Sequence, residues 1–358
     1  MAEFALPALV AIFVWWFSTG LILLLDGLRP ETFRRSMAFA TFFLLSALSG
    51  TWAIAQDSSV TGAYVGFLCG LAVWGWIELS FLTGLITGPR RTPCPPGLSG
   101  PRRVVAAIGA ILWHECAIIA AAVVLVALSW GAANQVAVWT FMILWVMRQS
   151  TKINIFLGAR NTGEVFLPDH LRYIGSYFRH RSMNLLFPFS VMASTLFCAW
   201  LFHHAFKSGA TPFDVTAASL LGTLAALAVL EHWFLMMPLP IERLWRWAMD
   251  RREASGRAAP RVAAWESGLS APCDADRLGR LLNEVADGAY GPVESLRGTL
   301  RSASGSGWVE FDLSGGRAQL AAFTPAANAA PRVVAVGATQ DLMRLRAALL
   351  ACLRPAAA

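Results

Sequence analysis

Apolar runs long enough to cross a membrane recur along the first two thirds of this chain. A hydrocarbon core about 30 Å thick requires about 20 consecutive apolar residues in a helix. Such runs occur at seven places, namely 4–25, 37–56, 60–87, 104–130, 134–158, 185–206 and 214–237. The fifth run is the least regular, because Arg148, Gln149 and Lys152 lie in its second half, and its apolar part is expected to end as early as Met147. We therefore expect an α-helical polytopic membrane protein with seven transmembrane helices.

The composition agrees with this expectation. Hydrophobic residues make up 56% of the chain, and charged residues make up 14%, against about 25% in soluble domains. The first apolar run has no basic region before it and no small-residue cleavage site, so we interpret it as a retained helix. The six cysteines form no C-x-x-C pair, which gives no indication of a zinc framework or a redox dithiol.

The basic residues lie in alternate loops. The loops after the first, third, fifth and seventh runs carry arginines, namely Arg29, Arg34, Arg35, Arg90, Arg91, Arg102, Arg103, Arg160, Arg172, Arg179, Arg181, Arg243, Arg246, Arg251 and Arg252. By the positive-inside rule these loops are cytoplasmic, which predicts an N-terminus on the outer side of the membrane and a cytoplasmic C-terminus. The net charge of +7 lies at helix ends, which favours membrane lipids over nucleic acid as partners.

The last third of the chain has a different pattern. We expect a seven-helix domain over 1–250, a polar linker over 251–262 and a cytoplasmic α+β domain over 263–358. Within that domain the sequence predicts a helix over 274–287 that Asp274 caps. Two alternating segments, "GWVEFDL" and "GRAQLAAF", predict a hairpin around 314–316, "RVVAVG" a third strand, and "TQDLMRLRAALLACL" a closing helix.

Five ionisable side chains interrupt the apolar runs. They are Glu78, His114, Glu115, Glu231 and His232. Each lies 11 or 12 residues from the nearest cytoplasmic arginine, which corresponds to about 16–18 Å of helix. Charged groups in a bilayer are costly and commonly mark functional sites. We therefore predict a polar cluster at one depth, shared by three helices.

Three interpretations of this cluster stay open. The first is a hydrogen-bonded network that holds the helices together, because buried ionisable groups in helical bundles usually pair. The second is a ligand site, in which a neutral imidazole binds the metal of a tetrapyrrole and a carboxylate fixes its tautomer. The third is a catalytic or proton-relay site. Adjacent Glu and His residues point about 100° apart on a helix, which argues against a di-iron enzyme.

Several activities are excluded by the motifs. No P-loop is present, and neither lysine follows a glycine-rich phosphate loop. There is no nucleophile elbow, and "WHECA" has no second histidine at the H-E-x-x-H position. The sequence assigns no catalytic residue and leaves a metal ligand unknown. The loop after the fifth run carries Leu171, Ile174 and Phe178 at helical spacing, which predicts either an interfacial amphipathic helix or a plain connecting helix.

The same loop carries the strongest family resemblance. "KINIFLGARNTGEVFLPDHLRYIGSYFRHRSMNLLFP" resembles the signature of the PuhE-like photosynthetic complex assembly proteins of purple phototrophic bacteria. The residues that match it are Asn154, Phe156, Leu157, Gly158, Leu167, Pro168, His170, Leu171, Tyr173, Met183, Asn184, Phe187 and Pro188. "EHWFLMMPLP" is also similar to the family, and the likeness covers about residues 5–250.

The resemblance implies a function. It implies a non-enzymatic factor that assembles the reaction centre and light-harvesting complexes, or that modulates or delivers bacteriochlorophyll. The implied location is the bacterial inner (intracytoplasmic) membrane, where the outer N-terminus would be periplasmic. The factor's expected partners are subunits of those complexes or proteins of bacteriochlorophyll synthesis, and the expected ligand is bacteriochlorophyll or a precursor. The alternative is a membrane enzyme or transporter that acts on a tetrapyrrole or a metal through the mid-membrane acids. The segment 273–354 separately resembles the C-terminal domain of CobW-type GTPases, without the GTPase half or the metal-binding tracts.

Overall fold

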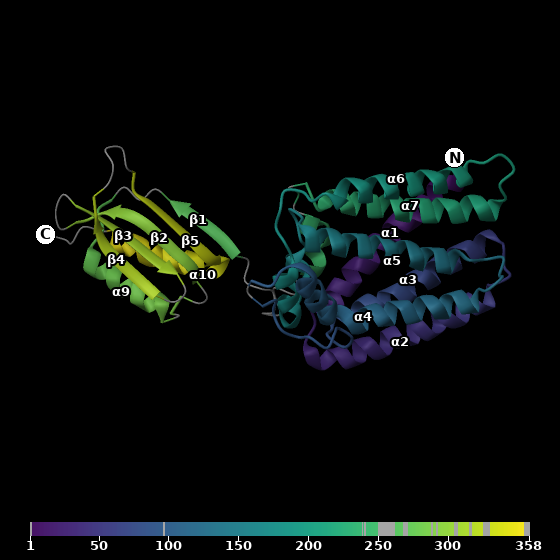
Figure 1. Cartoon of the computed structure of the whole chain (residues 1–358), viewed down its shortest axis with the longest axis horizontal. Coiled ribbons are helices and arrows are strands. Elements are labelled where there is room, and N and C mark those ends of the chain that lie inside the picture. Colours follow the sequence, from purple (N-terminus) through teal and green to yellow (C-terminus); the bar gives the residue numbers. More distant parts are fainter. Residues whose placement is uncertain are drawn as a thin grey trace. The chain divides into compact units, whose positions relative to one another are not determined.

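The computed structural model divides the chain into two compact units, 1–258 and 259–358. Within residues 2–353 it describes every residue except 96, 238, 240, 250–261, 268–270, 288, 291–292, 304–306, 315–316 and 325–329. Most of the predicted linker, 251–262, therefore lies outside the described residues. The first unit is helical, and the second contains a sheet (Figure 1).

The helical unit consists of long helices joined by loops and short 3₁₀ segments. The long helices are α1 (Ala2–Asp26), α2 (Pro30–Ala53), α3 (Val60–Leu82), α4 (Gly100–Leu128), α5 (Val136–Leu157), α6 (Leu186–Ala205) and α7 (Pro212–Phe234). The 3₁₀ segments are η1 (Glu164–Phe166), η2 (Asp169–Tyr177) and η3 (Ile241–Trp245). Each predicted apolar run thus corresponds to one long helix, although the ends of the runs and helices differ.

Six of these helices are long and apolar enough to cross a membrane, within the described part of the chain. The exception is α5, which is 22 residues long but carries Arg148 and Lys152 in its second half. Its side chains at Phe141 and Asn154 are completely buried, and it packs against α3 and α7. The low hydropathy of α5 therefore reflects polar side chains that point into the protein.

Two helices form the centre of the unit. In α3 and α7, 61% of the most apolar window is buried, against 17–22% in the other four apolar helices. Phe67 of α3 and Leu220 of α7 belong to one buried cluster and are fully inaccessible. The start of α7 is fixed by a capping box, because the Thr211 hydroxyl accepts from the Asp214 N–H and the Asp214 carboxylate accepts from the Thr211 N–H.

The third predicted span was too long. It was expected to continue to residue 87, but α3 ends at Leu82 and residues 83–90 are not helical. Gly84 has a φ of 76°, which favours glycine and turns the chain out of the helix. The chain then runs along α4, where the Arg90 N–H donates to the Gly109 carbonyl at 3.0 Å. The depth estimate for Glu78 assumed helix up to Arg90, and that assumption was wrong.

The predicted α-helix after α5 is instead the 3₁₀ segment η2. Leu171, Ile174 and Tyr177 are its buried residues, and their spacing of three matches a 3₁₀ turn. Leu171 and Ile174 pack against Phe81 and Leu82 at the end of α3. The apolar face of η2 therefore contacts the bundle, which supports the connecting role over the interfacial one.

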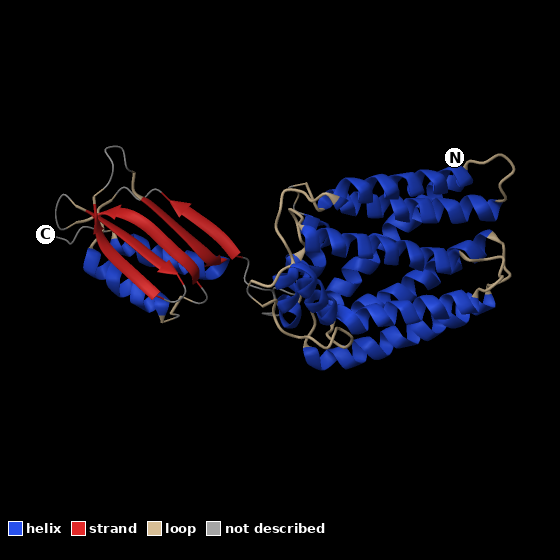
Figure 2. Ribbon diagram, viewed as in Figure 1, coloured by secondary structure: helices blue, strands red, loops and turns tan. Residues whose placement is uncertain are grey.

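The second unit contains a five-stranded antiparallel sheet among its described residues. The strands are β1 (Val262–Ser267), β2 (Val293–Arg301), β3 (Trp308–Ser314), β4 (Arg317–Phe323) and β5 (Arg332–Ala338), in the order β1-β5-β2-β3-β4. Helices α9 (Ala275–Ala286) and α10 (Thr339–Cys352) lie on one face of the sheet (Figure 2). The predicted cap of α9 is confirmed, because the Asp274 carboxylate accepts from the N–H groups of Asp276 and Arg277.

Two of these strands were missed by the sequence analysis. The expected hairpin is formed by β3 and β4, and the expected third strand is β5, but β1 and the central strand β2 were not predicted. In β2, Leu296 and Leu300 are completely buried, and Gly298 stands between them on the same face. A glycine at that position hides the apolar alternation that identifies a strand.

Replacing Gly298 by alanine should destabilise this domain. A Cβ atom there would lie 2.9 Å from Cζ of Phe311 and would also meet the Arg332 carbonyl, so the expected cost is about 2 kcal/mol. The measurement is urea unfolding of residues 259–358 expressed alone. Gly279→Ala is the matched control, because Gly279 lies within α9 and a Cβ atom there would contact only Leu320, at 3.7 Å. This substitution should stabilise the domain slightly, since alanine favours a helix more than glycine does. Equal effects of both substitutions would contradict the prediction.

The stability of the same domain should fall at alkaline pH. Burial raises the pKa of the Cys273 thiol from 9.0 to about 12, and burial also raises the pKa of the Cys352 thiol. Cys273 therefore ionises near pH 9 in the unfolded chain but only near pH 12 in the folded domain, so ionisation favours the unfolded chain between these values. The stabilisation is complete below about pH 9 and is lost as the pH rises toward about 12. Urea unfolding at about pH 8 and about pH 10.5 measures this loss. Cys273→Ala should lose less stability between the two pH values, and an unchanged loss would contradict the assignment.

Candidate functional site

A cavity of about 720 Å³ lies among five helices of the helical unit. It is lined by side chains of α1, α3, α4, α5 and α7, together with residues of the loop after α5 and of η2 and η3. Most of the lining is apolar and includes the aromatic side chains of Trp15, Trp74, Phe81, Phe156 and Trp245. This volume lies within the about 300–1,000 Å³ that small-molecule sites occupy.

Five charged side chains line the cavity, and they come from four helices. Glu78 lies on α3, Glu115 on α4 and Glu231 on α7, whereas Arg148 and Lys152 both lie on α5. Because Arg148 and Lys152 are four residues apart, they share one face of that helix. The structure therefore brings the three predicted acids to one cavity, and α5 supplies two cations opposite them.

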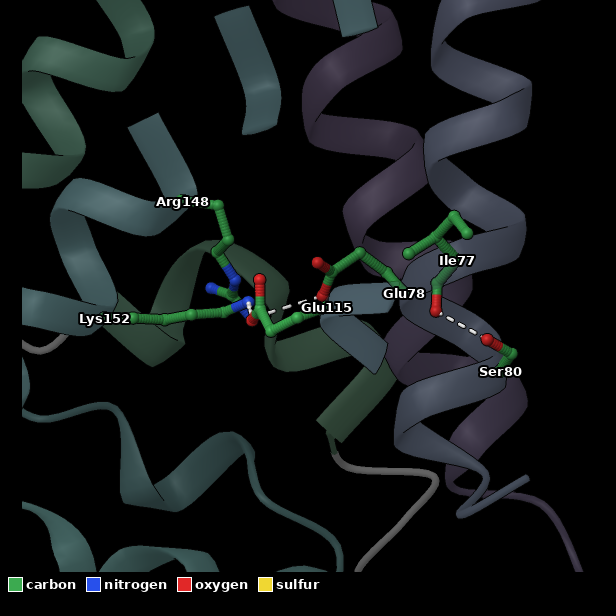
Figure 3. A network of polar contacts seen from close by, with 6 residues as sticks. All are labelled: Ile77, Glu78, Ser80, Glu115, Arg148 and Lys152. Carbon is green, nitrogen blue, oxygen red and sulfur yellow. Dashed lines mark hydrogen bonds and ion pairs between the residues drawn. The ribbon is translucent and has the colours of Figure 1, made fainter. Parts of the chain in front are cut away.

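The cations of α5 form separate ion pairs with two of the acids. Nη2 of Arg148 lies 3.2 Å from Oε2 of Glu78, and Nζ of Lys152 lies 2.6 Å from Oε1 of Glu115. The amide of Gln149 donates to the other oxygen of Glu115. Figure 3 shows the side chains of Glu78, Glu115, Arg148 and Lys152 pointing toward one another. These contacts connect α3 and α4 to α5 by charge.

Glu231 differs from the other two acids. Its Oε1 accepts a hydrogen bond from Nε1 of Trp15 at 3.0 Å, and no cation within the described residues forms an ion pair with it. Glu231 is solvent-accessible, and it lines the cavity. Glu231 is thus the acid whose carboxylate a molecule in the cavity can approach.

The two histidines that precede or follow these acids do not line the cavity. His114 is 1% exposed, its ring lies 4.4 Å from that of Phe81, and its Nδ1 has no hydrogen-bond partner among the described residues. His232 is completely buried, with Nδ1 2.8 Å from the Ala228 carbonyl and Nε2 2.8 Å from the Ser150 hydroxyl. His232 therefore joins α7 to α5.

Three residues of the signature loop form a hydrogen-bonded joint between α5 and α6. Nδ2 of Asn184 lies 3.0 Å from Oδ1 of Asn154 and 2.8 Å from the Gly158 carbonyl. Oδ1 of Asn184 accepts from the N–H groups of Leu186 and Phe187 at the start of α6. Gly158 has a φ of 139° and ends α5. These residues satisfy backbone groups and lie outside the cavity lining.

The other signature residues have structural positions as well. Pro168 is buried and caps η2, and Pro188 lies in the first turn of α6, where a missing N–H costs nothing. His170 is exposed, with its ring 6.2 Å from that of Phe33. The Tyr173 hydroxyl is buried and has no hydrogen-bond partner among the described residues.

The sequence analysis missed Arg148, Gln149 and Lys152 as members of the site. Their signal was visible as the polar second half of the fifth run, but it was interpreted as a possible end of the span. Groups of three or more His, Cys, Asp or Glu side chains that could hold a metal ion are absent from the described residues. A ligand in the cavity would instead meet single carboxylates and an aromatic wall.

The six apolar helices are compatible with a multi-pass helical membrane protein, and the helical unit contains a mostly apolar cavity with five charged side chains. The chain belongs to the family described as "Protein of unknown function (DUF3623)", whose sequence model matches residues 1–256. It is also 40% identical over 252 residues to the "Uncharacterized 30.4 kDa protein in puhA 5'region" of Rhodobacter capsulatus. That match covers 69% of this chain and 92% of the relative.

No solved structure matches the chain. The family match ends at residue 256, and neither match supports the resemblance of the C-terminal domain to CobW-type GTPases.

Proposed function

We propose that this protein is a non-enzymatic inner-membrane factor for the production of bacterial photosynthetic complexes, and that it binds a tetrapyrrole pigment in its cavity. The observation that carries the proposal is the relative whose description places it in the puhA 5' region. The signature-loop resemblance points to the same process. The aromatic cavity of about 720 Å³ supplies a place for an apolar ligand.

The cavity offers carboxylates, and not imidazoles, as side chains that could bind the metal of a pigment. His114 and His232 were the candidate ligands for a tetrapyrrole metal, but neither lines the cavity. Glu231 lines it, and its Oε2 has no hydrogen-bond partner among the described residues, while Trp15, Trp74 and Phe81 provide flat apolar surfaces. When bound, the pigment would supply light absorption and a central metal, and the chain would enclose and orient it.

Deleting the gene in a phototrophic bacterium that carries it tests the proposal. Membranes of the deletion strain should show weaker absorption bands of the pigment–protein complexes, and the intact gene should restore them. The protein purified from phototrophically grown cells should also carry chlorin absorption. Unchanged membrane spectra together with a colourless protein would contradict the proposal.

A second candidate function is a transporter or enzyme that acts on a tetrapyrrole or a metal. The ion pairs Glu78–Arg148 and Glu115–Lys152 favour it, because charged pairs inside a membrane often mark ion or substrate pathways. Bound iron without pigment in the purified protein would favour this candidate. Chlorin absorption without metal turnover would favour the pigment factor.

We also propose that α5 spans the membrane with the six apolar helices, which gives seven spans, a periplasmic N-terminus and a cytoplasmic C-terminus. The support is the alternation of basic loops and the enclosure of α5 among the other helices. Reporter fusions at Gly97, Gly163 and the C-terminus should then be cytoplasmic, and a fusion at Ser59 should be periplasmic. A periplasmic signal at Gly163 would overturn this orientation. The C-terminal domain would then serve as a cytoplasmic docking module for protein partners.

A further inference from the structure

The charges around the cavity do not balance. Three carboxylates and two cations line it, so their formal charges leave an excess of one negative charge. Glu78 and Glu115 are each paired with a cation of α5. The excess therefore belongs to Glu231, whose hydrogen bond comes from the neutral indole of Trp15.

A second observation also points to missing positive charge. Glu78 is 7% exposed, and its Oε1 has no hydrogen-bond partner among the described residues. A buried carboxylate oxygen without a donor costs free energy. Arg148, which also interacts electrostatically with Glu231, is thus shared between two acids. The cavity contains more acceptors than its own donors satisfy.

We infer that the cavity selects an apolar ligand with a positively charged or Lewis-acidic centre, and that Glu231 is the side chain that meets this centre. This inference rests on the proposed function, under which the ligand is a tetrapyrrole pigment, and it narrows that ligand to a magnesium-chelated, esterified ring. Magnesium prefers oxygen ligands, and Glu231 would supply a carboxylate oxygen to it when such a ring is bound. Metal-free rings lack this centre.

The same charge count disfavours pigments with free acid groups. A carboxylate on the ligand would add a negative charge to a cavity that already has an excess of one. To pair with that carboxylate, Arg148 would have to leave Glu78, or Lys152 would have to leave Glu115. Like charges at short distance in a low-dielectric site repel strongly. Esterified rings should therefore bind better than the corresponding acids.

Three ring compounds test the inference on the full-length protein in detergent micelles. The probes are magnesium protoporphyrin dimethyl ester, the metal-free dimethyl ester and the magnesium diacid, and the readout is the shift of the main absorption band relative to empty micelles. Wild-type protein should bind the magnesium ester about tenfold more tightly than either other probe. In Glu231→Gln the metal preference should disappear, while binding of the metal-free ester persists and shows that the cavity is intact.

Glu31→Gln is the matched control, because Glu31 is exposed in the first turn of α2 and does not line the cavity. It should leave all three affinities unchanged. Equal affinity of wild-type protein for both esters, a metal preference that survives in Glu231→Gln, or tighter binding of the diacid would overturn the inference and leave pigment binding in place. Failure of wild-type protein to bind any ring would overturn the proposed pigment function itself.

Discussion

Replacing Lys152 by methionine should lower the free energy of unfolding of the helical unit by about 3 kcal/mol, because it leaves the Glu115 carboxylate inside the bundle without its cation. The loss exceeds that of a surface ion pair, since both side chains are only about one fifth exposed. Gln149 still donates to Glu115, but a neutral amide does not compensate its charge. Thermal unfolding in detergent and the level of protein in membranes both measure the effect.

A second substitution in the same chain separates charge from packing. Glu115→Gln combined with Lys152→Met should recover most of the lost stability, because the uncompensated charge is then gone. Lys207→Met is the matched control, since Lys207 is exposed in the loop after α6 and forms no ion pair within the described residues. A double variant that is no more stable than Lys152→Met would show that the pair does not hold α4 to α5 by charge.

Asn184→Ala should have a comparable effect through a different cause. It removes the donor to the Asn154 side chain and the Gly158 carbonyl, and it removes the acceptor for two N–H groups at the start of α6. Asn184 is 8% exposed, so water cannot replace these partners freely. With about 1–3 kcal/mol for each buried polar group left unsatisfied, we expect a total of about 3 kcal/mol.

Thermal unfolding in detergent measures this loss as well. Met183→Ala at the neighbouring position should change stability by less than about 0.5 kcal/mol, because that side chain is 55% exposed. A similar melting temperature for both variants would refute the structural role of the signature loop. Asn184 would then have no assigned role in the structure.

The helices of the helical unit could be predicted because a bilayer requires apolar runs of a minimum length, and each run was long enough to be recognised as one helix. The ends of the runs were less predictable. Leu85 and Ile86 continue the apolar run beyond the helix, so hydropathy did not show that α3 ends at Leu82. That end depends on Gly84 and on hydrogen bonds to α4, and hydropathy contains no information about neighbouring helices.

The candidate site could be predicted in part for the same reason. Buried acids are rare enough to be noticed singly, and Glu78, Glu115 and Glu231 do line one cavity. The histidines beside them turn away, because adjacent residues on a helix point about 100° apart. Arg148 and Lys152 were noted only as an irregularity of the fifth apolar run, since their partners lie 70 and 37 residues away in the sequence.

The charged face of α5 has a consequence for how the protein is made. An arginine or lysine at the middle of a membrane-spanning helix adds about 2.5–3.5 kcal/mol to the cost of insertion into lipid, and α5 carries one of each in its second half. If α5 spans the membrane as proposed, the acids of α3 and α4 would lower this cost by pairing with its cations. Both helices precede α5 in the chain, so the counter-charges would be synthesised first, and α5 would insert beside helices that are already in the membrane.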